Sequence, residues 1–187
     1  MNSNHLCNIQ SKNTIDHLKE CLQIEVINRS GNKQFSWFKV FHRVIFSRKK
    51  RFYFWWRIAN YLYSLPNNRY KKLARKINDN LRHKYGADMS IAAHIGAGMK
   101  INHYLGIVVR SECIIGKDMN IRQNTTIGRK SSRGDIGITF IGDNADIGAH
   151  SCIIGDNVTI GAMTFVNKDI PDNSVIYNTV SSIIKSK

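Results

Sequence analysis

The sequence predicts a coil of short parallel β-strands preceded by a basic α-helical region. The first observation is a six-residue repeat in the second half of the 187-residue chain, and the second is a helix-like spacing of apolar residues in the first half. The third is the charge, a net +15 that gathers in the helix-like half. We therefore expect two parts, residues 1–86 and residues 87–187.

The repeat runs from Ile95 through eleven hexads such as IGAGMK, IGKDMN and IGDNAD, each starting with Ile or Val, and seven of them continue with Gly. A period of six fits neither an amphipathic helix nor an exposed strand. It fits a short strand plus a turn, with the aliphatic residue pointing inward and three hexads closing a triangular turn of about eighteen residues. Gly, Asn and Asp suit the corners, where positive φ is needed. A β-sandwich with Gly-rich turns is the alternative, but its turns would be spaced less evenly.

The register of the repeat breaks in three places. Two are short slips, near Ile107 and near residues 153–154. The third is long: fourteen residues, IGRKSSRGDIGITF, separate the hexad at Ile127 from the one at Ile141, where six would be enough. A polar insertion has no role in the core of a solenoid, so we expect a projecting, functional loop at about residues 129–138.

The helix-like half has apolar residues at mixed spacings of three and four in FSWFKVFHRVIFSRKKRFYFWWRIANYLYSL and in NNRYKKLARKINDNLRHKYG. Pro66 separates the two segments, and Gly86 is a natural helix end. Residues 1–34 contain one weak helical pattern, TIDHLKECLQIEVI, and we expect this segment to be loosely attached.

Composition excludes several classes of protein. No apolar run approaches the roughly 18 residues of a membrane-spanning helix, and the N-terminus lacks the features of a secretory signal, so we expect a cytoplasmic protein. The cysteines are far apart, without a CxxC pair, which disfavours zinc and a disulfide framework and predicts reduced thiols. They are Cys7, Cys21, Cys113 and Cys152.

The stretch ADMSIAAHIGAGMKINHYLGIVVRSECIIGKDMNIRQNTTIG resembles the hexapeptide-repeat acyltransferases. It looks most like the serine acetyltransferases and the related O-acetyltransferases of capsule, exopolysaccharide and lipopolysaccharide assembly, and the likeness covers about Tyr85 to Ile176. The resemblance implies a left-handed parallel β-helix, a homotrimer, and acetyl-CoA lying as co-substrate in a groove between two neighbouring coils. It implies no metal.

The resemblance also implies a catalytic pair. In the family's motif an acidic residue lies fifteen positions before a histidine, and the matching residues here are Asp88 and His103. Acetyl transfer to an alcohol needs a base near neutral pH, and histidine suits that task, with a carboxylate to orient it. A partly buried histidine bonded to a neighbouring coil's carbonyl is the structural alternative. His94 and His150 have no such acidic partner, and we interpret them as surface residues.

For the cofactor, the family uses backbone groups at small residues of the later coils. The candidates here are Gly128, Gly148, Ala149, Gly161 and Ala162, with Lys168 for a CoA phosphate.

The acceptor is predicted from the inserted loop. Serine acetyltransferases carry an Asp-Arg-His run there that grips the amino acid, and here Ile136, Gly137 and Ile138 take those positions. Since free serine needs its charges paired, a sugar hydroxyl of a bacterial surface glycan is the better prediction. The candidate acceptor-binding residues are Asn102, which replaces an aspartate of the serine enzymes, and Arg129, Lys130 and Arg133.

The basic half predicts peripheral contact with the anionic inner face of the cytoplasmic membrane, where lipid-linked glycan intermediates lie. The segment SRKKRFYFWWR interleaves cations with aromatic residues as an interfacial helix does. An acidic polysaccharide or nonspecific nucleic-acid binding is an alternative, although no specific nucleic acid is predicted. A helical cap with a solvated basic face is equally compatible.

The leading hypothesis is therefore an acetyl-CoA-dependent O-acetyltransferase that acts on a surface-glycan sugar with His103 as general base. A serine O-acetyltransferase with a divergent loop is the alternative within the same enzyme class. Two others are a zinc enzyme of the β-helical carbonic anhydrase kind, using His94, His103 and His150, and a non-enzymatic basic trimeric adaptor.

Overall fold

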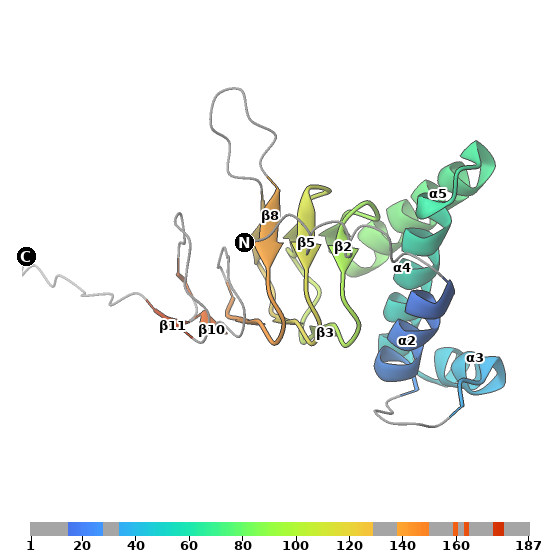
Figure 1. Cartoon of the computed structure of the whole chain (residues 1–187), viewed down its shortest axis with the longest axis horizontal. Coiled ribbons are helices and arrows are strands. Elements are labelled where there is room, and N and C mark those ends of the chain that lie inside the picture. Colours follow the sequence, from blue (N-terminus) through green and yellow to red (C-terminus); the bar gives the residue numbers. More distant parts are fainter. Residues whose placement is uncertain are drawn as a thin grey trace, which may run out of the picture.

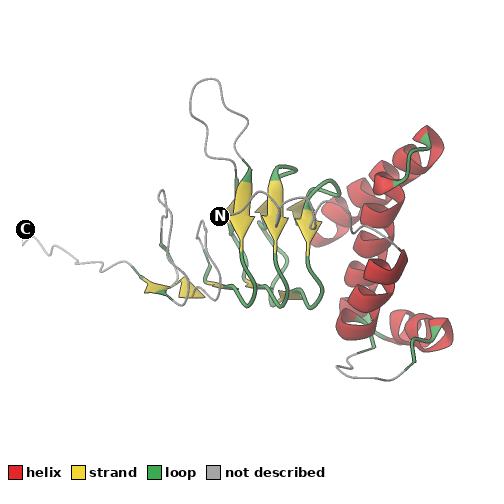
Figure 2. Cartoon of the chain, viewed as in Figure 1, coloured by secondary structure: helices red, strands yellow, loops and turns green. Residues whose placement is uncertain are grey.

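The computed structural model describes residues 15–27, 34–128, 138–149, 159–160, 163–164 and 174–177. A bundle of helices lies at one end of a stack of strand coils (Figures 1 and 2). The described helices are α2 (Ile15–Glu25), α3 (Trp37–Phe46), α4 (Arg48–Ser64) and α5 (Asn68–Tyr85). The strands begin at Asp88, directly after the last helix.

The strands form three parallel sheets, which are the three sides of the coil. The first sheet contains β1 (Asp88–Met89), β4 (Val108–Val109) and β7 (Thr126–Ile127). The second contains β2 (His94–Ile95), β5 (Cys113–Ile115) and β8 (Thr139–Ile141). The third contains β3 (Lys100–Ile101), β6 (Asn120–Ile121), β9 (Asp146–Ile147), β10 (Thr159–Ile160) and β11 (Val175–Ile176). From β1 to β9, successive strands of the chain therefore belong to successive sides, as the repeat predicts.

The register of the sheets explains the breaks in the repeat. Val108 pairs with Thr126, eighteen residues later, which is the predicted turn of three hexads. Asp88 pairs with Val108 after twenty residues, because of the slip near Ile107. Cys113 pairs with Thr139 after twenty-six, so the insertion adds eight residues to one turn. Residues 129–137 of that loop lie outside the described residues.

The leading residue of each described hexad is buried, as predicted. The column comprises Ile95, Ile101, Val109, Ile115, Ile121, Ile127, Ile141, Ile147 and Ile160. Stacking them removes a continuous aliphatic surface from water, and each side chain contributes roughly 1.5–3 kcal/mol by full burial. The hydrophobic effect thus sets the period of six.

The corners and the glycines have different structural reasons. Positive φ occurs at Asp118, Asn124 and Asn144, which confirms the predicted use of Asn and Asp at corners. At position 96 a glycine is required for a different reason. A Cβ atom there would lie 2.5 Å from the carbonyl oxygen of Gly116 in the next coil. The glycine after the leading Ile permits close stacking of coils, a role that the sequence analysis attributed to turn formation alone.

The helices begin and end close to the predicted signals. Asn67 accepts a hydrogen bond from the Arg69 N–H at the start of α5, and Gly86, with φ 68°, caps its end. The first long segment divides into two helices, because Ser47 is extended. The Arg51 side chain donates to the carbonyl of Val44 (2.9 Å) and so satisfies a free carbonyl at the end of α3.

Helix α4 caps the open end of the coil. The first coil has no preceding coil to pair with, and unpaired backbone groups in a buried place are costly. The Trp56 indole N–H donates to the Met89 carbonyl (3.2 Å). The Asn60 amide donates to the carbonyls of Ile91 (2.8 Å) and Ala93 (3.0 Å). Side chains of α4 therefore replace the missing strand partners.

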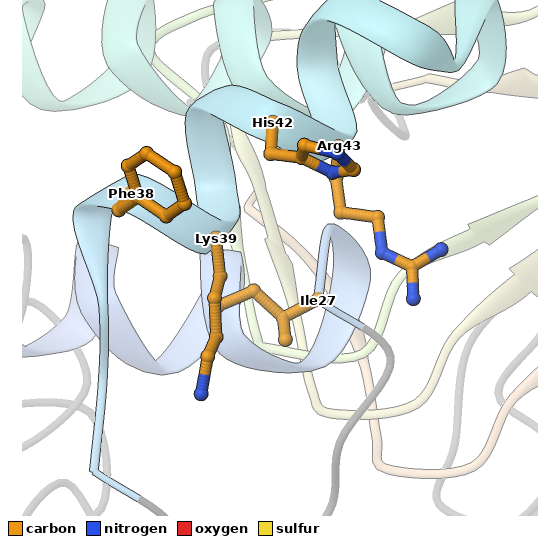
Figure 3. A pocket seen from close by; sticks show the side chains of 5 residues that line it. All are labelled: Ile27, Phe38, Lys39, His42 and Arg43. Atoms are coloured by element: carbon orange, nitrogen blue, oxygen red, sulfur yellow. The ribbon is translucent and has the colours of Figure 1, made fainter.

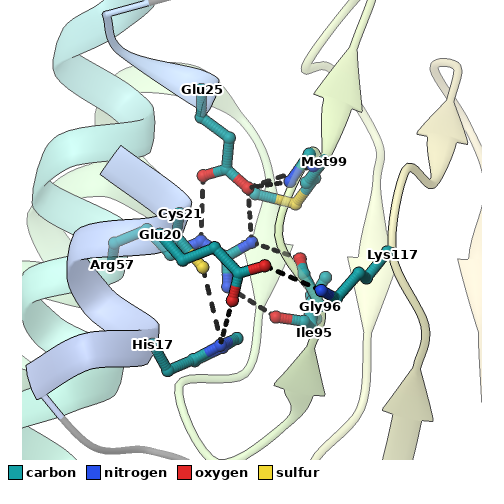
Figure 4. A network of polar contacts seen from close by, with 10 residues as sticks. His17, Glu20, Cys21, Glu25, Arg57, Ile95, Gly96, Met99 and Lys117 are labelled. Carbon is teal, nitrogen blue, oxygen red and sulfur yellow. Dashed lines mark hydrogen bonds and ion pairs between the residues drawn. The ribbon is translucent and has the colours of Figure 1, made fainter. Parts of the chain in front are cut away.

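A buried ion pair completes this cap (Figure 4). The Arg57 guanidinium donates two hydrogen bonds to the Glu25 carboxylate (2.5 and 2.9 Å) and two more to the carbonyls of Ile95 and Gly96 (2.6 and 2.7 Å). Glu25 Oε1 also accepts the N–H groups of Gly98 and Met99. Each charge thus has the partners that burial requires.

The expectation of a loosely attached N-terminal segment is wrong for residues 15–27. Helix α2 supplies Glu25 to the cap and buries Leu18, Cys21 and Leu22. A weak amphipathic pattern was misleading here, because the decisive interaction is a single carboxylate that binds distant backbone N–H groups. Residues 1–14 and 28–33 lie outside the described residues.

His94 is not the surface residue that we expected. Its ring stacks on His17 of α2, with 5.4 Å between ring centroids. Burial, together with the nearby Arg57 cation, lowers the pKa of His94. The same causes, and His94 itself, lower the pKa of His17 from 6.5 to about 4. The two imidazoles are therefore neutral packing groups at neutral pH.

This pair predicts a loss of stability on mild acidification. Because the folded-state pKa of His17 is below its unfolded value, the unfolded state binds more protons between about pH 6.5 and pH 4. The free energy of unfolding should therefore fall as the pH is lowered through that window. Urea unfolding of the protein at pH 7 and pH 5 measures the fall. The fall should be smaller in His17→Phe, and an equal fall in both proteins would contradict the assignment.

Candidate functional site

The segment after β3 carries the predicted catalytic residue. Strand β3 is held by the Tyr53 hydroxyl of α4, which accepts the Ile101 N–H (2.8 Å). Tyr104 packs against Phe52 (4.7 Å between ring centroids), and its hydroxyl donates to the Lys49 carbonyl (3.3 Å). The residues on both sides of this corner are therefore anchored on the helical cap. His103 lies between them and is exposed.

Asp88, the predicted partner of His103, lies on β1. Its backbone N–H donates to the Ile107 carbonyl (2.8 Å), which joins it to the end of the corner that carries His103. Its carboxylate, half exposed, lies 3.7 Å from the Arg82 guanidinium at the end of α5. The described contacts of the single chain include no hydrogen bond between Asp88 and His103. The catalytic pair stays a prediction.

Asn102 heads a ladder of polar side chains across three coils. Its amide donates to Asn120 (3.1 Å), whose own amide donates to Asp146 (2.9 Å). Arg122 forms the other contacts of Asp146, at 2.7 and 3.4 Å. Of these four residues, only Asn102 was predicted from the sequence as a site residue. Alignment of the hexads could have found two of them, because Asn120 and Asp146 share the position just before the leading Ile.

The register of the third sheet brings predicted catalytic and cofactor residues to one corner. Ile101 pairs with Ile121, which pairs with Ile147. His103 on the first coil therefore corresponds to Gln123 on the second and Ala149 on the third. Since neighbouring parallel strands lie about 4.8 Å apart, Ala149 is roughly 10 Å from His103 along the stack. That distance suits a cofactor arm lying along the corner.

The other cofactor candidates are placed differently. The backbone N–H of Gly148 donates to Ile160 (2.7 Å) and its carbonyl accepts from Thr125 (3.1 Å), so Gly148 offers little more than its small size. Gly128 follows β7 of the first sheet and lies at another corner. Six further candidates lie outside the described residues: Arg129, Lys130, Arg133, Gly161, Ala162 and Lys168.

Within the described ranges, no group of three His, Cys, Asp or Glu side chains is arranged to hold a metal ion. Of the three histidines proposed for a zinc enzyme, His94 is engaged with His17, and His103 is exposed at a different side of the coil. His150 lies outside the described residues. The described geometry offers no support for the zinc hypothesis.

No family model matches the chain. The serine acetyltransferase of Staphylococcus epidermidis is 33% identical over 135 residues, which cover 70% of this chain and 62% of that protein. Across the first curated relatives, all serine acetyltransferases, the chain spans between 34% and 62% of their length.

Solved structures share the fold. A serine acetyltransferase of Neisseria gonorrhoeae in complex with serine superposes with a TM-score of 0.64 at 24% identity, covering 88% of this chain and 66% of that one. A serine acetyltransferase in complex with CoA gives the same TM-score and identity, covering 94% of this chain and 72% of that one. These likenesses confirm the predicted left-handed β-helix behind a helical N-terminal region.

Proposed function

Since the chain is a hexapeptide-repeat protein with the fold of the serine acetyltransferases and a sequence similar to theirs, we propose that it is an acetyl-CoA-dependent O-acetyltransferase. The observation that carries the proposal is the corner of the third sheet. There an exposed histidine, His103, stands in line with the small residue Ala149 two coils away. A relative of the same fold holds CoA, which supports acetyl-CoA as the co-substrate.

The proposed mechanism is direct transfer. The acceptor hydroxyl oxygen attacks the thioester carbonyl while the His103 imidazole takes the hydroxyl proton. The tetrahedral intermediate then collapses, the C–S bond breaks, and the departing CoA sulfur takes up a proton. Asp88 would orient the imidazole, since its half-exposed carboxylate can turn from Arg82. Backbone N–H groups would stabilise the oxyanion.

The proposal includes a homotrimer. In a single chain His103 is exposed, whereas a thioester must be kept from water to be transferred rather than hydrolysed. A neighbouring subunit packed along the third sheet would supply the second wall of the site. The polar ladder from Asn102 to Asp146 lies beside that corner and would form part of the acceptor side.

The comparisons favour serine as the acceptor over the surface glycan that the sequence analysis preferred. The first curated relatives are serine acetyltransferases, and one solved relative holds serine. None of these relatives points to polysaccharide biosynthesis. Serine is therefore the main proposed acceptor, and a surface-glycan sugar is the second candidate.

Two residues, Ile138 and Asn102, support the glycan as the second candidate acceptor. Ile138, at the end of the inserted loop, is an exposed apolar residue where the resemblance implies a histidine that grips serine. Asn102 is neutral where the resemblance implies an aspartate, so it cannot neutralise an ammonium group. The amides of Asn102 and Asn120 instead suit the hydroxyls of a sugar.

An acceptor assay separates the two candidates. Purified full-length protein with acetyl-CoA is expected to release CoA and form O-acetylserine when L-serine is added, as followed by thiol release and mass spectrometry. O-methylserine, which lacks the hydroxyl, is the control and should stay unmodified. Acetylation of sugars but not of serine would replace the main proposal by the glycan candidate. Mass spectrometry of surface glycans from cells with and without the gene would then identify the sugar.

A further inference from the structure

Helix α3 exposes an apolar face that the described chain covers only in part, at Phe41, whose ring contacts Phe54 of α4. Phe38, Phe41, Ile45 and Phe46 share one side of the helix, and Phe38 and Phe46 are 81% and 76% exposed. Only Val40 and Val44 of this helix are buried. Figure 1 shows α3 at the end of the helical region, away from the coils. His42, which packs on Phe46, lies among them, and an exposed, mainly apolar face of this kind marks an interaction surface.

The segment that the sequence analysis assigned to the membrane has another task. In α4, Phe52, Tyr53, Phe54 and Trp56 are buried, and Arg57 binds Glu25 in the cap. These side chains therefore face the molecule rather than a bilayer, whereas Arg48, Lys49 and Trp55 of the same segment are exposed. The structure moves the candidate surface from α4 to α3.

Cations border the apolar face of α3. Lys39, Arg43, Arg48 and Lys49 are exposed, and no ion pair among the described residues uses them. The sequence contains no acid between Glu25 and Asp79. Arg48 and Lys49 lie in the first turn of α4. Their positive charges interact unfavourably with the helix dipole, whose N-terminal end is also positive. Folding alone does not account for cations at this place.

An open hollow of about 470 Å³ adjoins this face (Figure 3). It is lined by Ile27, Phe38, Lys39, His42 and Arg43. Apolar side chains thus line it together with the Lys39 and Arg43 cations. This combination suits the junction of a phosphate-bearing headgroup with an acyl chain.

We propose that α3 is an interfacial membrane anchor that binds an anionic bilayer. Its apolar face would enter the acyl boundary while Lys39 and Arg43 contact lipid phosphates. A second copy of the chain is a poorer occupant, because it would bring the same positive charge to the interface. Nucleic acid would leave Phe38 and Phe46 in water. None of the described helices is both long and apolar enough to cross a bilayer.

Sedimentation with vesicles tests the proposal on the full-length protein. Binding to vesicles of phosphatidylcholine with about one quarter phosphatidylserine should exceed binding to pure phosphatidylcholine by at least about tenfold. Phe38→Ser with Phe46→Ser should lower the binding by about tenfold or more. Val175→Ser with Tyr177→Ser, which replaces apolar residues of similar exposure on and just after β11, is the matched control and should change the binding little.

A charge series and a solution measurement complete the test. Lys39→Glu with Arg43→Glu should remove the preference for anionic vesicles. Lys72→Glu with Lys76→Glu on α5 changes the net charge by the same amount and should retain most of that preference. The proposal is overturned by equal binding to both vesicle types, by equal loss in both charge variants, or by binding that survives Phe38→Ser with Phe46→Ser. It is also overturned if, without lipid, this pair of serine substitutions reduces the oligomeric state in light scattering.

Discussion

Replacing His103 with alanine is expected to lower the rate of acetyl transfer by about 10²- to 10⁴-fold, the usual contribution of a general base. His103 is exposed and makes none of the core contacts, so the fold and the affinity for CoA should be retained. Steady-state rates with acetyl-CoA and the identified acceptor measure the loss. Circular dichroism checks that the fold is retained, and titration with CoA checks that the affinity for CoA is retained.

The matched control for this substitution is His83→Ala, an exposed histidine on α5 that should leave the rate unchanged. An unchanged rate in His103→Ala would remove the proposed mechanism, whereas the absence of acetyl transfer by the unsubstituted protein would favour the adaptor hypothesis, which needs no base. Asp88→Asn tests the orienting carboxylate and should lower the rate and alter its pH profile. Arg82→Gln breaks the same ion pair but keeps the carboxylate, so equal effects of the two would assign Asp88 a structural role only.

Replacing Glu25 with glutamine is expected to lower the free energy of unfolding by about 3–5 kcal/mol, because it leaves a buried guanidinium without its counter-charge. The side chains of Glu25 and Arg57 are 0% and 1% exposed, so water cannot substitute for the missing charge. Urea unfolding followed by circular dichroism measures the change.

The control is Lys117→Gln, which breaks the exposed ion pair between Lys117 and Glu20. That pair is short, 2.7 Å, but its exposure predicts a loss of at most about 1 kcal/mol. The apolar double variant Glu25→Leu with Arg57→Met should not restore stability, because the backbone groups of Ile95, Gly96 and Gly98 would lose their partners. Equal losses in Glu25→Gln and Lys117→Gln would contradict the role assigned to the cap.

The coil was predictable because its cause is local and repeated. Each hexad places an aliphatic residue at the same phase, and burial of that residue is favourable wherever the hexad occurs. The extra eight residues before β8 were equally visible as a break in that phase. The helix ends at Asn67 and Gly86 follow from backbone preferences that need no distant partner.

The helical half was predictable in kind but not in orientation. Helices α3 and α4 carry the same mixture of aromatic residues and cations, so sequence spacing could not tell which one faces the coil. The open end of the coil decides which helix faces it. The carbonyls of Met89 and Ile95 need hydrogen-bond donors, and Trp56 and Arg57 of α4 supply them. The role of Glu25 could not be predicted from the sequence either, because its partners include backbone groups of a distant segment.

The sequence by itself determined the period of the coil and the basic character of the cap, since both follow from residue types at fixed spacings, and its family resemblance supplied the catalytic candidates His103 and Asp88. Only the tertiary structure decided which aromatic face stays exposed on α3, that His94 packs against His17, and that Asn102 begins a ladder across three coils. These features depend on segments far apart in the chain, whose contacts arise when burial and backbone pairing are satisfied together.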